Sequence, residues 1–180
     1  INRVLLNSSL SFLSEIKLYF GQITSKKELN SIIKDLKIDN ILAKFAVVHR
    51  LSSGTFNSLR IAIQIEQIIK KTNPKYIITT FEGHAWERLV YYYARRTNPN
   101  IKCFGYQHSA VFEHHNSIKR PLNNKYNPDV VFTSGKIAEN ILNQSQVKIG
   151  KVLCLGTDKY LPPIISPCKS NCCLVIPEGS

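Results

Sequence analysis

Apolar residues recur at helical spacing through the first 72 residues of the chain. The pattern predicts four helices, over residues 8–20, 25–36, 39–50 and 55–71. We expect Gly21 to end the first helix and a capping box of Ser25 and Glu28 to open the second. The helix over residues 55–71 is apolar on more than one side, so we expect it to be well buried.

From residue 76 onward, short β-branched and aromatic runs alternate with helical or connecting stretches. The predicted strands are residues 76–81, 101–106, 129–133 and a fourth within 147–155. The predicted helices between them are residues 84–96 and 135–142, the latter with Ser134 as N-cap, and residues 110–128 form a long loop. This alternation predicts an α/β fold: a Rossmann-like parallel sheet whose faces the N-terminal helices cover.

The two ends of the chain indicate a piece of a longer protein. The chain opens on Ile1, contains no Met, and closes on an apolar run typical of a buried strand. We expect residues 1–156 to form one domain, the Pro-rich residues 157–170 a linker, and residues 171–180 the first strand of a second α/β domain. Two such domains would enclose a cleft, where a ligand is expected.

Composition narrows the choice of partners. The net charge of +12, from 24 basic and 12 acidic residues, favours an anionic partner, although a genome rich in Lys, Asn and Ile codons would explain it equally well. The five cysteines make a poor disulfide framework and fit reduced thiols in a cytosolic setting. No apolar run approaches the roughly 20 residues of a membrane-spanning helix.

Two reactive side chains directly follow predicted parallel strands. Glu82 and Gly83 come after the strand at residues 76–81, and His108 follows the next strand. Because parallel strands end at one edge of a sheet, we expect Glu82 and His108 to face the same rim. His108 suits a general base, and Glu82 suits a base, a ligand for a sugar hydroxyl or a partner for a histidine. A structural histidine and a helix N-terminal acid are the alternatives.

Neighbouring polar residues are candidates for substrate binding. They are His84, Gln107, Ser109, Arg120 and Ser134. Arg120 would hold a phosphate or carboxylate, and Ser134 begins a helix that could bind an anion, with a solvated basic loop as the alternative for Arg120. Glu87 lies one helical turn from His84, and we interpret that pair as an ordinary surface contact. We expect no metal site, because the cysteines lack a second ligand pair.

The segments E-G-x-x-W-E (residues 82–87) and G-Y-Q-H (residues 105–108), followed by NPDVVFTSG and GKVLCLGT, resemble the N-terminal half of GT-B-type glycosyltransferases. The resemblance is to enzymes of bacterial capsule and lipopolysaccharide biosynthesis and covers residues 76–157. It implies a two-domain enzyme whose N-terminal domain binds the acceptor and whose C-terminal domain binds a nucleotide sugar, without a cofactor. Related polymer transferases use a Q-x-W-H-G turn with His as base; here Gln107-His108 lacks the Trp and has Ser109 in place of Gly.

The function expected from these observations is transfer of a sugar from a nucleotide sugar to a glycan or lipid-linked glycan acceptor, with no nucleic acid as partner. A cytoplasmic location is implied, with association at the inner face of the membrane as an open question. Two alternatives stay open: a basic nucleic-acid-binding module and a non-catalytic α/β assembly domain. Against the first, aromatic residues are not expected on exposed strands beside basic neighbours, as a stacking platform requires.

Overall fold

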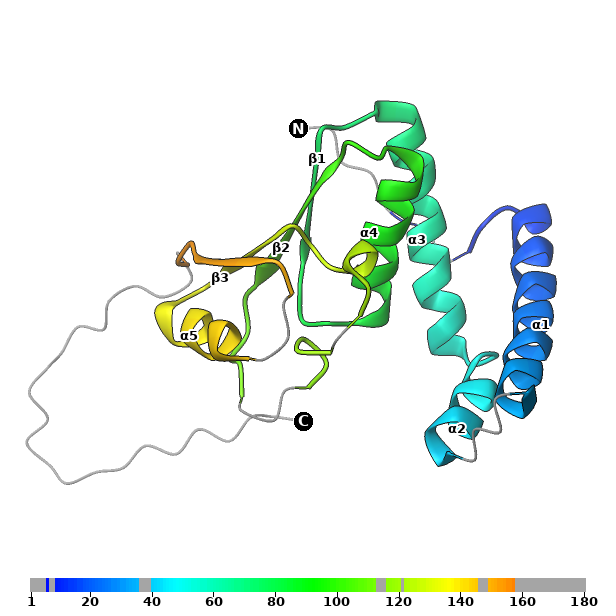
Figure 1. Ribbon diagram of the computed structural model, residues 1–180. Helices are drawn as coiled ribbons and strands as arrows, with labels where there is room; N and C mark the ends of the chain where they lie inside the picture. The colour runs from blue at the N-terminus through cyan, green and yellow to red at the C-terminus, as the bar shows by residue number, and fades with distance from the viewer. Residues whose placement is uncertain are drawn as a thin grey trace, which may run out of the picture.

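The protein has an α/β architecture built on a four-stranded parallel sheet. Figure 1 shows the computed structural model, which describes residues 6, 9–35, 40–112, 116–120, 122–145 and 149–157. In chain order the helices are α1 (Phe12–Asp35), α2 (Ile41–His49), α3 (Ser53–Thr72), α4 (Ala85–Thr97), the 3₁₀ helix η1 (Asn124–Tyr126) and α5 (Lys136–Gln144). The strands are β1 (Tyr76–Thr80), β2 (Lys102–Gln107), β3 (Val130–Thr133) and β4 (Lys151–Cys154). The expected linker and second-domain strand lie outside the described residues, apart from residue 157.

The strands lie in the sheet in the same order as in the chain, β1-β2-β3-β4, and every neighbouring pair is parallel. The predicted parallel α/β sheet is therefore confirmed. One face of the sheet packs against α4 and α5 around the buried residues Cys103, Val131, Tyr91, Ala94 and Leu142. In the described part of the chain, we find no helix with the length and apolarity needed to cross a membrane.

No helix among the described residues covers the opposite face of the sheet, which carries aromatic side chains. Tyr76 and Ile78 are 61% and 67% exposed. Phe104 is in register with Ile78, and its ring lies 6.0 Å from that of Tyr76 and 5.7 Å from that of Phe132. The expectation that the N-terminal helices cover both faces is wrong: Figure 1 shows α1 and α2 beyond α3, away from the sheet.

This uncovered face also carries exposed lysines. Lys102 pairs with Tyr76 in the sheet register, and Lys151 pairs with Val130, so these side chains share one face. Both lysines are exposed. The premise that no aromatic residues lie on exposed strands beside basic neighbours is therefore wrong. Sequence alternation within short strands did not reveal which of the two faces the helices would leave open.

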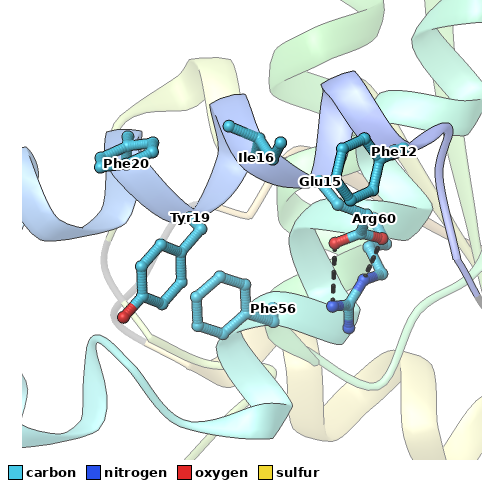
Figure 2. A pocket seen from close by; sticks show the side chains of 7 residues that line it. All are labelled: Phe12, Glu15, Ile16, Tyr19, Phe20, Phe56 and Arg60. Atoms are coloured by element: carbon cyan, nitrogen blue, oxygen red, sulfur yellow. Dashed lines mark hydrogen bonds and ion pairs between the residues drawn. The ribbon is translucent and has the colours of Figure 1, made fainter.

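Helix α1 is one continuous helix of 24 residues, so the expected break at Gly21 and the capping box at Ser25 are wrong. A glycine inside a helix lowers helix stability by about 1 kcal/mol relative to alanine, and the stability of the helical turns on both sides of Gly21 offsets this loss. Arg60 of α3 binds Glu15 through two hydrogen bonds of 2.7 and 3.0 Å, and Tyr19 stacks on Phe56 (Figure 2). These contacts hold the N-terminal half of α1 beside α3.

Helix α3 is half-buried rather than well buried, because only Ala62, Glu66 and Ile69 on it are fully covered. Its side chains meet α4, where Arg96 Nη2 lies 2.9 Å from Glu66 Oε1. Helix α5 begins after Gly135, without a side-chain capping bond, so the expected N-cap role of Ser134 is also wrong. The Ser134 N–H instead donates to the Gln107 carbonyl at 3.0 Å.

Candidate functional site

The carboxyl ends of β1 and β2 form the candidate site. Phe81 N–H donates to the Tyr106 carbonyl at 2.9 Å, so the segments that follow β1 and β2 leave the sheet side by side. Gly83 then takes a positive φ of 83°, and a Cβ there would lie 2.4 Å from the Ser117 carbonyl carbon. Glycine is required at this position, because any side chain would both strain the backbone and collide with the segment at residues 116–120.

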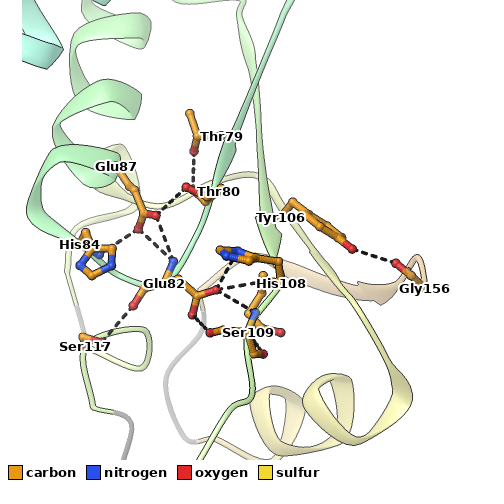
Figure 3. A network of polar contacts seen from close by, with 11 residues as sticks. Thr79, Thr80, Glu82, His84, Glu87, Tyr106, His108, Ser109, Ser117 and Gly156 are labelled. Atoms are coloured by element: carbon orange, nitrogen blue, oxygen red, sulfur yellow. Dashed lines mark hydrogen bonds and ion pairs between the residues drawn. The ribbon is translucent and has the colours of Figure 1, made fainter. Parts of the chain in front are cut away.

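Glu82 and His108 meet at this edge, as the strand pattern predicts. His108 Nδ1 lies 3.2 Å from Glu82 Oε1 (Figure 3). The same carboxylate accepts hydrogen bonds from the backbone N–H groups of His108 and Ser109, both at 3.2 Å, and from Ser109 Oγ at 2.6 Å. The Glu82 carboxylate, in the turn after β1, therefore fixes both the backbone and the imidazole of the turn after β2.

The two partners differ in their access to solvent. The Glu82 side chain is 9% exposed, whereas the His108 side chain is 39% exposed. A neutral imidazole that donates Nδ1–H to a carboxylate presents Nε2 as a proton acceptor. The arrangement can therefore accept a proton from a hydroxyl group at Nε2 while Glu82 stabilises the imidazolium that forms.

Glu87 is fully buried, so its interpretation as a surface contact with His84 is wrong. Its carboxylate accepts hydrogen bonds from the backbone N–H of Glu82 at 3.0 Å, the backbone N–H of His84 at 2.8 Å and Thr80 Oγ1 at 3.1 Å. Burial raises the pKa of Glu87, and these hydrogen bonds oppose the rise. Its place as the third residue of α4 was the available signal, because an acid there commonly bonds back to the N-cap.

The other predicted residues lie around the same edge with different exposure. His84 is the exposed N-cap of α4. Gln107 is fully buried and its Nε2 donates to the Ser109 carbonyl, while its Oε1 has no hydrogen-bond partner in the described ranges. Ser134 is half-buried at the end of β3, next to Gln107. The structure therefore brings Glu82, His108 and Ser109 into direct contact and sets the others around them.

Arg88 holds the loop after β2 against this edge, a role that sequence reasoning missed. Its side chain is 3% exposed and donates to Asn127 Oδ1 at 2.5 Å and to the Ser117 and Ile118 carbonyls at 2.8 and 3.2 Å. Burial, and then the charge of exposed Arg120, lower the pKa of Arg88. An arginine within a helical stretch gives no sequence signal of burial, so this anchor was not foreseeable.

No protein-family model, curated protein or solved structure matches this chain. The class that the fold defines is an α/β protein with a parallel sheet and a polar edge at the carboxyl ends of its strands. At that edge, His108 Nδ1 contacts the Glu82 carboxylate.

Proposed function

We propose that this chain is the acceptor-binding part of a GT-B-type glycosyltransferase of bacterial surface carbohydrate biosynthesis, with His108 as general base. The observation that carries the proposal is the 3.2 Å contact between His108 Nδ1 and the Glu82 carboxylate at the ends of two parallel strands. The exposure of the imidazole supports the proposal, because a general base must reach the hydroxyl that it deprotonates.

In the proposed reaction, Glu82 holds the imidazole by its Nδ1–H and Nε2 takes the proton of an acceptor hydroxyl. The hydroxyl oxygen forms a bond to the anomeric carbon of a nucleotide sugar. The bond from that carbon to the nucleotide phosphate breaks, and the phosphate leaves with the electron pair. Positioned general bases contribute about 10²–10⁴ in rate, which sets the scale of the loss expected when His108 is removed.

Substrate contacts follow from the surrounding side chains. We assign His84, Ser109 and Ser134 to the acceptor, and we assign Arg120, whose side chain is exposed, to an anionic group of the acceptor or the donor. Buried Gln107 supports the turn by bonding the Ser109 carbonyl. A nucleotide sugar and a glycan or lipid-linked glycan are the proposed substrates, with no cofactor, and the proposed location is the cytoplasm at the inner face of the membrane.

The test is sugar transfer by the full-length protein, with nucleotide release measured across a panel of nucleotide sugars and surface-glycan acceptors. We expect His108→Ala to lower kcat by roughly 100-fold or more and Glu82→Gln by a smaller factor. His49→Ala, at an exposed histidine on α2, is the matched control and should retain the wild-type rate. Wild-type turnover in both His108→Ala and Glu82→Gln would show that His108 is not the general base.

A second candidate function is favoured by the uncovered sheet face. Tyr76, Phe104 and Phe132 form a row of aromatic rings beside Lys102, an arrangement compatible with stacking of single-stranded nucleic acid. This candidate predicts salt-sensitive binding of a single-stranded RNA that Tyr76→Ala and Lys102→Ala weaken. An affinity unchanged by both substitutions would leave the glycosyltransferase proposal as the single candidate.

A further inference from the structure

A cavity of about 620 Å³ lies between α1 and the paired helices α3 and α4, away from the Glu82–His108 edge. Leu18 and Gln22 of α1 form one wall, and Leu59 of α3 and Tyr92 and Tyr93 of α4 form the other. Small-molecule sites commonly have volumes of about 300–1,000 Å³, so this cavity has the size of a ligand site and exceeds what a single small ion needs.

Two buried polar atoms at this cavity have no hydrogen-bond partner among the described residues. Gln22 is 6% exposed, and its Oε1 accepts no hydrogen bond from the part of the chain that the structure describes. The Arg50 Nε is also buried and finds no acceptor in the described segments. Both residues line the cavity. Leaving a buried polar group unpaired is unfavourable, so an occupant that supplies a donor for Gln22 and an acceptor for Arg50 would be stabilised here.

The charges around the cavity are unbalanced. Lys17 and Arg50 line it, and neither makes an ion pair with any residue that the structure describes. The other cation of the wall, Arg96, is already paired with Glu66, and Glu66 also binds Lys70 at 3.1 Å. Within the described residues, two positive charges therefore have no counter-charge, which favours an anionic group in the occupant.

From these observations we propose that the cleft binds a phosphate-bearing polyol, such as a sugar phosphate. The phosphate lies between Lys17 and Arg50 and accepts from the Arg50 Nε–H, and a hydroxyl group donates to Gln22 Oε1. The apolar faces of Leu18, Leu59 and Tyr93 contact the carbon skeleton. This site uses none of the residues of the proposed reaction, so it does not rest on the proposed function.

The wall formed by α1 is fixed from its other side. On a neighbouring face of α1, Glu15 accepts hydrogen bonds from Arg60 of α3, and Tyr19 stacks on Phe56 of α3 (Figure 2). The Arg60 hydrogen bond lowers the pKa of Glu15, so this ion pair is present at neutral pH. A ligand in the cleft would add a second bridge between α1 and the α3–α4 pair, which predicts a rise in Tm on binding.

The experiment is isothermal titration of the full chain with glucose 1-phosphate, together with inorganic phosphate and glucose. Vesicles of phosphatidylcholine with and without phosphatidylglycerol distinguish a free sugar phosphate from a lipid headgroup of the same chemistry. We expect saturable binding of glucose 1-phosphate or of the phosphatidylglycerol vesicles, weakened at least tenfold by Arg50→Gln and by Lys17→Gln. Gln22→Leu should weaken the polyol phosphate but leave any binding of inorganic phosphate unchanged.

Lys151→Gln, at an exposed lysine on β4, is the matched control and should bind like the wild type. Circular dichroism verifies that each variant is folded, and exposed Lys17 supplies a second variant if Arg50→Gln does not fold. The proposal is overturned if neither glucose 1-phosphate nor the phosphatidylglycerol vesicles bind saturably. It is equally overturned if binding persists unchanged when Lys17 and Arg50 are both replaced, or if Glu82→Gln abolishes binding and Arg50→Gln does not.

Discussion

At the residue scale, Glu87 determines the shape of the β1–α4 turn. Its buried carboxylate accepts hydrogen bonds from three converging donors: Glu82 N–H, His84 N–H and Thr80 Oγ1. Glu82 in turn holds His108, so the general base in the proposed reaction depends on a carboxylate that never contacts it. Glu87 is therefore a positioning residue, and its ionisation links the stability of the fold to pH.

Glu87→Gln tests this link through the pH dependence of stability. Burial raises the folded-state pKa of Glu87 above the ordinary value of about 4.3, so the folded protein binds this proton more tightly than the unfolded chain. The stability contributed by the group is complete below about pH 4 and falls as pH rises through the raised pKa.

Near pH 4 we expect the free energy of unfolding of the wild type to exceed that of Glu87→Gln by about 1–3 kcal/mol, because the amide has one acceptor oxygen fewer. This difference between the two proteins should become smaller towards pH 7. Urea unfolding of both proteins between pH 4 and pH 7 measures the gap. Glu28→Gln, at an exposed carboxylate on α1, controls for the loss of one negative charge. A gap that widens with rising pH would contradict the burial argument.

At the element scale, the sequence predicted most elements, and its errors have local causes. The β-branched run at Tyr76–Thr80 and the turn formers at Asn98 and Pro99 place strands and crossovers, because those residues restrict the backbone directly. Gly21 was misinterpreted because a glycine within a helix and a glycine after a helix look alike in sequence. The edge position of Glu82 and His108 follows from parallel topology, whereas the burial of Glu87 and Arg88 depends on the loop that folds over them.

Gly21→Ala distinguishes a continuous α1 from two shorter helices. Gly21 lies inside α1, and a Cβ added there would meet no atom within 4 Å. We expect the substitution to stabilise the protein by up to about 1 kcal/mol, through helix propensity. Thermal unfolding followed by circular dichroism measures the effect. A loss of stability would instead indicate that the residue needs the left-handed conformation of a helix C-terminus.

At the scale of the whole molecule, the uncovered sheet face is the largest departure from the usual design of parallel sheets, which are covered on both faces. Tyr76, Ile78, Phe104 and Phe132 form a continuous apolar area on it. Exposed apolar areas of this kind mark interaction surfaces or sites of self-association. This face therefore offers exposed apolar area to solvent, in addition to the exposed apolar side chains of α1 and α2.

The chain is accordingly expected to bind the dye ANS at neutral pH without unfolding. Ile78→Lys combined with Tyr76→Lys should reduce the dye fluorescence severalfold, because both side chains are exposed and their replacement removes apolar area without opening the core. Ile137→Lys, at an exposed isoleucine on α5, is the matched control. Fluorescence that stays at the wild-type level in the double variant would show that the dye binds elsewhere, such as on α1 and α2.

The order of the strands has a consequence for how the protein folds. Each strand pairs with the strand that follows it in the chain, so no pairing in the described sheet has to wait for a distant segment. Folding rates rise as contacting residues lie closer in sequence, so the sheet can grow strand by strand from β1. During synthesis, β1, α4 and β2 would emerge and pair before β4 is made, and the Glu82–His108 contact would form before the last strand joins the sheet.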